Sequence, residues 1–254
     1  MQESRAAVVT GASSGIGQAT ARRLAQDGDR ILAVGRNAAA LKVVCDEITA
    51  KGGVAVPCVA DVTADDAPAR IVAAALKHFG RIDVLVNAAG IIASGSVADT
   101  TDEAWDVMMN INVRAPFRLI RAASAELIRA KGAVVNLSSV TGTRAFPGIA
   151  AYCVSKSAVD QLTRCAALEM AAAGVRVNAV NPGVVVTNLH RRGGMDETKY
   201  AAFLEHSKET HPMGRPGTPD DVASLIRFLV SAESGWITGI TANVDGGRHL
   251  TCLR

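Results

Sequence analysis

The chain has 254 residues, of which 49% are hydrophobic and 4% aromatic, and its 27 basic and 24 acidic residues give a formal net charge of +3. So many aliphatic and so few aromatic side chains are typical of a single open α/β sheet. The near-balanced charge, without a basic stripe and interleaved aromatics, argues against nucleic-acid binding. The five cysteines have no C-x-x-C spacing and the five histidines no H-x-x-H pairing, so we expect free thiols and no metal site.

Membrane and export signals are also missing from the sequence. No apolar run approaches the roughly 18 residues of a membrane span. The first strand is expected from about Ala6, which leaves no room for a signal peptide. We therefore expect a cytoplasmic protein with no membrane partner.

Short aliphatic runs alternate with segments of helical period along most of the chain. The aliphatic runs predict seven strands, at residues 6–10, 30–34, 54–60, 82–87, 133–137, 175–180 and 240–244. The helical segments lie at 15–26, 37–50, 65–79, 101–130, 152–172, 196–207 and 219–230. This alternation predicts right-handed βαβ crossovers. The fold class is therefore α/β, with one domain over residues 1–254: a doubly wound, mostly parallel seven-stranded sheet flanked by helices on both faces.

Three local features qualify this pattern. Thr63 is expected to cap the helix at 65–79, and the helix at 101–130 is expected to be interrupted or bent near Pro116. Residues 187–218 break the rhythm with several glycines and prolines and hold one short predicted helix. A loop of this length in a compact domain is usually functional, so we expect residues 188–213 to form a lid over a substrate.

A glycine-rich turn, TGASSGIG at residues 10–17, follows the first strand and opens the first helix. Gly11 would permit the tight turn, Gly15 the approach of a pyrophosphate to the backbone, and Gly17 the close packing of helix on strand. The N-terminus of the helix would supply free N–H groups and partial positive charge for the phosphates. No Gly-Lys-Ser/Thr follows, so the turn is not a P-loop.

Tyr152 and Lys156 are spaced i, i+4, which puts a phenol and an ammonium on one helical face. Alone, this pair could equally be a half-buried Tyr beside a Lys with its ammonium in solvent. Other motifs accompany it: NAAG at 87–90, Asn112, Ser139, NPG at 181–183 and DGG at 245–247.

Together with TGASSGIG, these motifs resemble the short-chain dehydrogenase/reductase family in order and spacing over essentially the whole chain. Residues 211–217 (HPMGRPG) and the VDGG ending look most like its 3-oxoacyl-[acyl-carrier-protein] reductase-like branch. The resemblance implies a Rossmann-type fold and an oxidoreductase that interconverts a carbonyl and an alcohol with a nicotinamide cofactor.

The resemblance also implies the catalytic residues. Ser139, rather than its neighbour Ser138, would donate a hydrogen bond to the carbonyl oxygen. Tyr152 would exchange the proton as general acid and base. Lys156 would lower the pKa of Tyr152, ordinarily about 10, and bind the nicotinamide ribose. Asn112, rather than Asn110, would hold a water that links Lys156 to solvent.

The end of the second strand bears on the choice of cofactor. NAD-type folds place an acid there for the ribose 2′-OH, and an Arg accommodates a 2′-phosphate. Here Gly35 occupies that position and Arg36 follows, which favours NADP(H) over NAD(H). Arg36 could also be a solvated surface charge, and the glycine-rich turn carries Ser14 where many NADP-using relatives have a basic residue.

Further cofactor contacts follow from the resemblance alone. Asp61 and Val62 would contact the adenine, and Asn87 would close strand hydrogen bonds and flank the adenosine ribose. The Val184 amide and the Thr187 hydroxyl would meet the carboxamide. The full expected cofactor set is Gly11, Ser13, Ser14, Gly15, Ile16, Gly17, Arg36, Asp61, Val62, Asn87, Ala88, Gly90, Tyr152, Lys156, Pro182, Gly183, Val184 and Thr187.

The substrate stays open at this level. The lid has as many basic as acidic residues, so its charge does not favour an acidic substrate. Its apolar residues could line a pocket or only pack the lid: Met195, Tyr200, Phe203, Leu204 and Met213. A 3-oxoacyl thioester competes with a small ketone, sugar or steroid, and a non-catalytic cofactor-binding sensor or an epimerase-like enzyme is the rival class. The resemblance further implies a homodimer or homotetramer.

Overall fold

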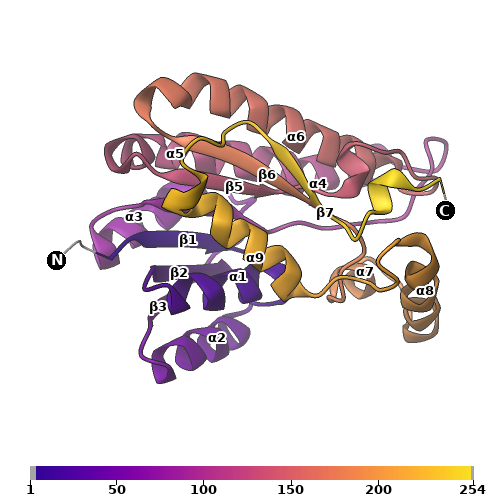
Figure 1. Ribbon diagram of the computed structural model, residues 1–254, viewed down its shortest axis with the longest axis horizontal. Helices are drawn as coiled ribbons and strands as arrows, with labels where there is room; N and C mark the ends of the chain where they lie inside the picture. Colours follow the sequence, from indigo (N-terminus) through magenta and orange to yellow (C-terminus); the bar gives the residue numbers. More distant parts are fainter. Residues whose placement is uncertain (1–3, 253–254) are drawn as a thin grey trace.

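The seven aliphatic runs form one sheet in which every neighbouring pair of strands is parallel, in the order β3-β2-β1-β4-β5-β6-β7 (Figure 1). The computed structural model describes residues 4–252. The strands are β1 (Ala6–Thr10), β2 (Arg30–Gly35), β3 (Val54–Val59), β4 (Val84–Asn87), β5 (Ala133–Leu137), β6 (Arg176–Pro182) and β7 (Thr241–Val244). The predicted α/β, doubly wound, Rossmann-type sheet is thus confirmed.

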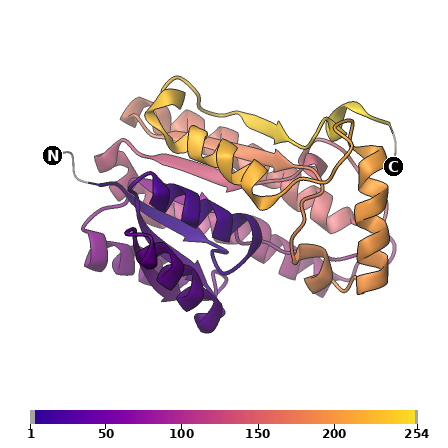
Figure 2. The same cartoon turned by 60° about the horizontal axis from the view of Figure 1, so that its bottom comes forward.

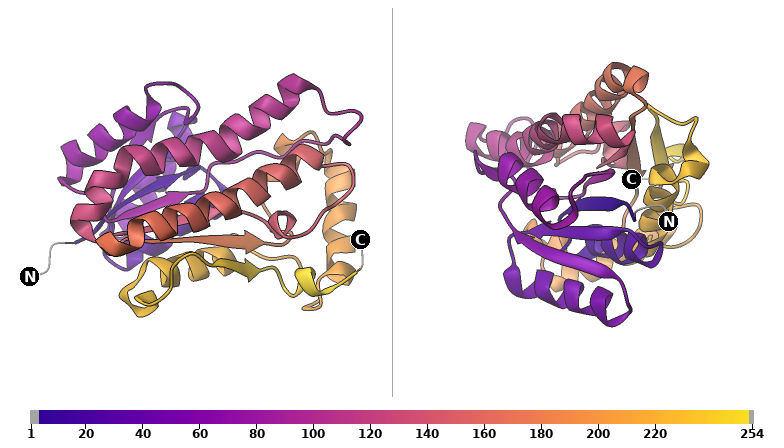
Figure 3. Two further views of the ribbon diagram at one scale, coloured as in Figure 1. Left: turned by 90° about the horizontal axis from the view of Figure 1, so that it is seen from above. Right: turned by 90° about the vertical axis from the view of Figure 1, so that its left-hand side faces the viewer.

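Helices cover both faces of the sheet, because alternate strand residues point to opposite sides. Ala6 and Val8 of β1 pack in the core beneath α3, α5 and α6, whereas Ala7 and Val9 pack beneath α1, α2 and α9. Figure 3 shows the first layer as long helices that run side by side across the sheet. The helices are α1 (Gly15–Gln26), α2 (Ala38–Ala50), α3 (Ala67–Phe79), α4 (Asp102–Met109), α5 (Ala115–Ala130), α6 (Ala150–Met170) and α9 (Pro219–Val230). Within residues 4–252 no helix is long and apolar enough to cross a membrane.

The start of α3 corrects the expected cap. Thr63 does not cap this helix: its backbone N–H and its hydroxyl both donate to the Asp61 carboxylate, at 3.0 and 2.7 Å. The helix begins four residues later, after Asp66, whose side chain makes no capping hydrogen bond. The Asp61–Thr63 turn therefore uses the hydroxyl that would otherwise have satisfied the helix.

The long helix predicted at 101–130 is interrupted, but not by its proline. A π-helical segment, Asn110–Arg114, separates α4 from α5. Pro116 lies in the first turn of α5, where its missing N–H needs no partner. π-Helical turns occur often at functional sites, and this one contains Asn112.

Two helices, rather than the single one predicted, form the segment between β6 and α9. They are α7 (Leu189–Arg192) and α8 (Glu197–Thr210), and Asp196 caps α8 by accepting from the Lys199 N–H at 2.8 Å. Both lie beyond the carboxyl ends of the strands, and α8 stands across them (Figure 2). This edge is where doubly wound sheets bind ligands.

Candidate active site

The glycine-rich turn between β1 and α1 adopts a backbone that other residues could not follow without strain. Gly11 and Gly15 have positive φ angles of 67° and 56°. A Cβ on Gly11 would lie 2.8 Å from the Ala88 carbonyl oxygen, and one on Gly17 would lie 2.5 Å from that of Gly11. Ser14 precedes α1 without a side-chain cap. The first-turn N–H groups are thus available to a phosphate, as the turn predicts.

A cavity of about 700 Å³ lies over this turn and the ends of the neighbouring strands. Twelve of the residues expected to bind the cofactor border it: Gly11, Ser13, Ser14, Gly15, Ile16, Gly17, Arg36, Asp61, Val62, Ala88, Gly90 and Thr187. Arg192, which the sequence did not single out, adds a second arginine from α7. Glycines without room for a Cβ, an uncapped helix N-terminus and two arginines fit a phosphate-bearing dinucleotide.

At the end of β2, the structure brings Arg36 into this cavity. A Cβ on Gly35 would come within 3.3 Å of the Ser13 hydroxyl, so this position has little room for an acidic side chain. The Arg36 guanidinium is 69% exposed and lies 3.8 Å from the Asp61 carboxylate. Hydrogen bonds from Thr63 hold the pKa of Asp61 below its usual value, and Arg36 adds to this shift.

Asn87 links neighbouring strands, in line with its expected strand hydrogen bonds, and is not among the residues that border the cavity. Its side chain donates to Asn136 of β5 at 2.9 Å, and Asn136 donates to Thr163 of α6 at 2.9 Å. Thr10 has a related role, because its hydroxyl accepts from the N–H groups of Ala88 and Ala89. These polar residues tie β1, β4, β5 and α6 together beneath the cavity. Alternation alone could not reveal them, since each occurs once in an apolar run.

Helix α6 carries Tyr152 and Lys156, both of which are buried. The Lys156 ammonium donates to the Leu137 carbonyl at 2.8 Å and lies 5.6 Å from the centre of the Tyr152 ring. Burial raises the pKa of Tyr152 to about 12, against the lowering effect of a hydrogen bond from Ser139. Burial also lowers the pKa of Lys156 to about 8, which Asp160 opposes. The net shift of the Tyr152 pKa is therefore upward, and desolvation is its main cause.

The two candidate serines have different environments. The Ser138 hydroxyl donates to the Lys156 carbonyl at 3.1 Å, inside α6. Ser139 instead hydrogen-bonds to Tyr152, and its Oγ accepts from the Thr141 N–H at 3.1 Å. Only Ser139 therefore shares a hydrogen bond with the phenol.

Asn112 is held in place by both ends of its amide. Its Oδ1 accepts from the Ile91 N–H at 2.9 Å, and its Nδ2 donates to the Ile91 carbonyl and to Ser155, each at 3.0 Å. Ser155 in turn donates to the Tyr152 carbonyl at 2.7 Å. Asn112 thus joins the loop after β4 to α6.

The turn after β6 places Pro182, Gly183, Val184 and Thr187 at the cleft, with one unexpected contact. The Val184 N–H donates to Nε2 of His211 at 3.1 Å, so it is not the amide left for a carboxamide. The N–H of Val185 has no hydrogen-bond partner among residues 4–252. A Cβ on Gly183 would lie 2.7 Å from His211 Nε2, so glycine is needed here. Sequence reasoning overlooked His211, although it begins the HPMGRPG motif.

A second cavity, of about 560 Å³, contains the catalytic group and opens toward α7 and α8. Ile16, Ala88, Gly90 and Thr187 border both cavities, which are therefore parts of one cleft. Of the five lid residues expected to line a pocket, Met195 and Phe203 border it. Leu204 and Met213 do not, and Tyr200 is buried with its hydroxyl donating to the Thr187 carbonyl at 2.9 Å.

Comparisons with known proteins agree with this geometry. Residues 11–249 match the family model described as enoyl-(acyl carrier protein) reductase. The chain is 35% identical over 250 residues to the 3-oxoacyl-[acyl-carrier-protein] reductase FabG of Thermotoga maritima, covering 96% of this chain and 98% of that protein. It is 36% identical over 244 residues to the 2,5-dichloro-2,5-cyclohexadiene-1,4-diol dehydrogenase LinX of Sphingobium indicum, covering 96% and 95%.

A solved structure from Beutenbergia cavernae, assigned as an NAD(P)-dependent gluconate 5-dehydrogenase with NADP bound at low occupancy, superposes with a TM-score of 0.89. It is 37% identical, and the match covers 98% of each chain. The sequence and the fold thus have counterparts over nearly the whole chain.

Proposed function

Because the chain belongs to the short-chain dehydrogenase/reductase family of NAD(P)-dependent oxidoreductases acting on CH–OH groups, we propose that it reversibly reduces a ketone to a secondary alcohol with NADP(H). The observation that carries this proposal is the position of Ser139, Tyr152 and Lys156 in one cleft with the glycine-rich turn. When bound, the nicotinamide cofactor supplies or accepts the hydride. The protein's own groups orient the carbonyl and move the proton.

Each catalytic side chain has a separate role. Ser139 holds the carbonyl oxygen beside the phenol. With a pKa of about 12, Tyr152 is protonated at neutral pH, so its hydroxyl can deliver a proton to that oxygen in the direction of reduction. Lys156 binds the ribose hydroxyls and presents its ammonium to the Tyr152 ring. Asn112 is a positioning residue that fixes α6 against the loop carrying Gly90 and Ile91.

The NADP(H) preference rests on the phosphate-binding end of the cleft. Arg36 and Arg192 border the cavity, and no acidic side chain stands at the end of β2. A guanidinium binds a phosphate through parallel hydrogen bonds, which gives the 2′-phosphate a partner that the 2′-OH of NAD(H) would not need. Residues 188–213 then act as the lid over the substrate.

We also place the protein in the cytoplasm, as a homodimer or homotetramer. All five cysteines are free, which suits a reducing compartment. Apolar side chains are exposed on the outer surface, among them Leu168 at 83% and Trp236 at 100%, and large exposed apolar groups often mark subunit interfaces. A monomeric mass in light scattering at micromolar concentration would contradict the assembly.

The function is tested by following the absorbance of NADPH and NADH with a panel of ketones. The panel contains acetoacetyl thioesters, diketones, an aromatic ketone and a steroid. Turnover that disappears in Tyr152→Phe, by about 10²–10⁴-fold in kcat, with NADPH binding retained, is the expected result. A variant that keeps more than about a tenth of the wild-type kcat contradicts the role of Tyr152. Tight NADPH binding without turnover of any ketone favours an untested substrate or the alternative of a non-catalytic cofactor-binding sensor.

A further inference from the structure

The charges of lid helix α8 are sorted by side, although the lid as a whole is balanced. Five α8 residues border the substrate cavity, at intervals that place them on one helical face: Lys199, Phe203, His206, Ser207 and Thr210. The three glutamates of the helix do not border it and are exposed: Glu197, Glu205 and Glu209. The side of α8 that faces the cavity therefore carries Lys199 and His206 and no acid, whereas the solvent side carries the three glutamates together with Lys208.

The rest of the cavity wall continues this asymmetry. Among the described residues that border it, no Asp or Glu occurs, whereas five can carry positive charge: Lys156, His190, Lys199, His206 and Arg248. Arg248 is buried, donates to the Thr251 hydroxyl at 3.0 Å and lies 5.1 Å from the centre of the Phe146 ring. Because a cavity wall of low polarity focuses the field of such groups, the site attracts anions.

Both basic residues on the cavity side of α8 lie near an acid. Lys199 lies 3.3 Å from Asp196, and His206 lies 3.5 Å from Glu209. All four side chains are at least half exposed, Lys199 at 78% and His206 at 50%, so water screens both pairs. Exposed pairs of this kind contribute at most about 1 kcal/mol, and a substrate anion can replace the carboxylates at little cost.

Apolar side chains make up much of the remaining cavity wall. Ile92, Phe146, Ile149, Leu189 and Phe203 border it. A ligand that satisfies both parts has an apolar body and a charged end.

We propose that the substrate of this site is an amphiphilic anion: a ketone, or its secondary alcohol, that carries a carboxylate or phosphate on an apolar skeleton. The carbonyl lies at Ser139 and Tyr152, and the anionic end lies against Lys199 and His206. This inference rests on the proposed function, and it differs from the expectation that the balanced charge of the lid does not favour an acidic substrate.

The test compares matched compounds that differ only in charge. Levulinate and its longer homologues are each assayed against their methyl esters, and one methyl ketone carrying a phosphate ester is included to separate the two anions. Binding to the protein with NADPH is measured by thermal shift, and turnover is measured separately. We expect the acid of optimal length to bind about fivefold more tightly than its ester, the value of one exposed ion pair with Lys199, and the preference to fall with added salt.

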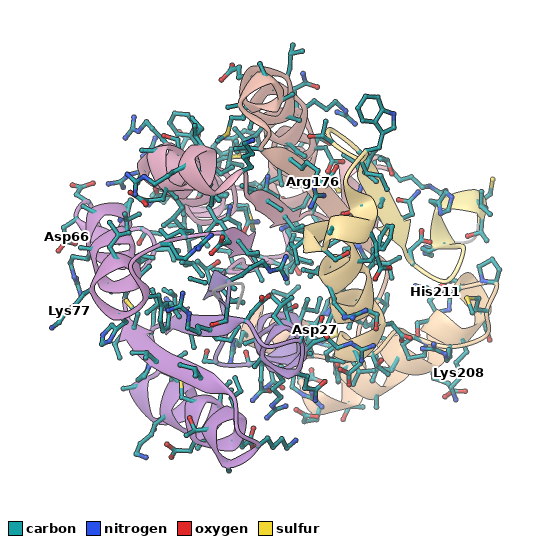
Figure 4. All side chains as sticks on the ribbon, turned by 60° about the vertical axis from the view of Figure 1, so that its left-hand side comes forward. Asp27, Asp66, Lys77, Arg176, Lys208 and His211 are labelled. Carbon is teal, nitrogen blue, oxygen red and sulfur yellow. The ribbon has the colours of Figure 1, made fainter. Side chains whose placement is uncertain are left out.

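The variants use a matched lysine on the same helix. Lys199→Gln should weaken binding of the acid about threefold to fivefold and leave the ester unchanged. Lys208→Gln removes the same charge from α8 but from a residue that does not border the cavity (Figure 4), and it should leave both compounds unchanged. His206→Asn combined with Lys199→Gln should abolish the preference.

Two outcomes overturn the inference: equal binding of acids and esters, or equal effects of Lys199→Gln and Lys208→Gln. Neither depends on turnover. Absence of turnover of every ketone with both cofactors would instead contradict the proposed function. Turnover of acids and esters at equal rates, with equal binding, would leave that function standing and remove the anionic substrate.

Discussion

His211 connects the lid to the turn that carries Val184, and its replacement is the sharpest test of the cleft. The ring is 2% exposed, at the point where the end of α8 meets the C-terminal segment (Figure 4). Its Nδ1 lies 2.8 Å from the Ser207 carbonyl, so it must donate there, and its Nε2 lies 3.1 Å from the Val184 N–H, so it must accept. These two partners assign a neutral imidazole with the proton on Nδ1.

His211→Leu removes the acceptor of the partly buried Val184 N–H. An unsatisfied buried donor costs about 1–3 kcal/mol, so this partly buried donor should cost about 1 kcal/mol, which lowers the melting temperature of a chain this size by about 2–4 °C. His211→Gln keeps an oxygen that can accept from Val184 and should recover more than half of the loss. Because Val184 lies in the turn after β6, which is expected to contact the cofactor, KM for NADPH should rise more than kcat falls in the Leu variant.

The pH dependence gives an independent readout. Burial lowers the pKa of His211 from its ordinary value of 6.5, and Arg248 adds to this shift, whereas Ser207 and Asp245 oppose it. The unfolded chain therefore binds the proton more readily, so the stability from His211 is present above about pH 6.5 and is lost as the pH falls below it. The difference in stability between the wild type and His211→Gln should shrink below that pH.

Thermal melts from about pH 5 to 8 bracket the ordinary histidine pKa of about 6.5 and would measure the effect on stability. NADPH kinetics near neutral pH would measure the effect on KM and kcat. His78→Leu, at an exposed position on α3, is the control for loss of a histidine. Equal melting temperatures for the Leu and Gln variants, or a pH-independent difference from wild type, would refute the assigned hydrogen bonds.

Three further predictions concern the cofactor side of the cleft. Gly17→Ala puts a Cβ 2.5 Å from the Gly11 carbonyl oxygen, so NADPH affinity in a fluorescence titration should fall at least about tenfold. Retained affinity would contradict the proposal that this turn binds the cofactor phosphates. The pKa of Lys156 is lowered to about 8. Because the proposed role of Lys156 needs its ammonium, kcat/KM for reduction should decline above that pH, and Lys156→Arg should move the decline to higher pH. Arg36→Leu should reduce kcat/KM with NADPH about tenfold and leave NADH unchanged; no loss with NADPH would make Arg36 a surface charge.

The strands could be predicted because a buried parallel strand leaves an uninterrupted aliphatic run. The ends moved by at most two residues, as with β4, which begins at Val84 rather than at residue 82. Turns that depend on one side chain were harder. Thr63 has the composition of a cap, yet a carboxylate two residues earlier captures its hydroxyl. Which of two local acceptors wins is decided by backbone geometry that composition does not encode.

Within the site, residues from several sequence motifs lie in one cleft, but the hydrogen-bond partners of single polar residues could not be predicted. The direction of Asn87 depends on Asn136, a residue of another strand 49 positions away. The engagement of Val184 depends on His211, 27 positions away. A single sequence shows the type of each side chain but not its partner across the fold, and for buried polar groups the partner determines the role.

The two sides of the cleft differ in how they are held, and this difference explains how one sheet can serve many substrates. On the sheet side, Asn87, Asn112 and Asn136 link strands and α6 through buried hydrogen bonds. On the lid side, the Tyr200–Thr187 and His211–Val184 hydrogen bonds join α8 and its C-terminal end to the turn after β6. The lid residues that border the substrate cavity come largely from this solvent-exposed helix. Changing the cavity face of α8 leaves the proton-transfer group in place, so the charge carried by Lys199 and His206 can set the substrate independently of the chemistry.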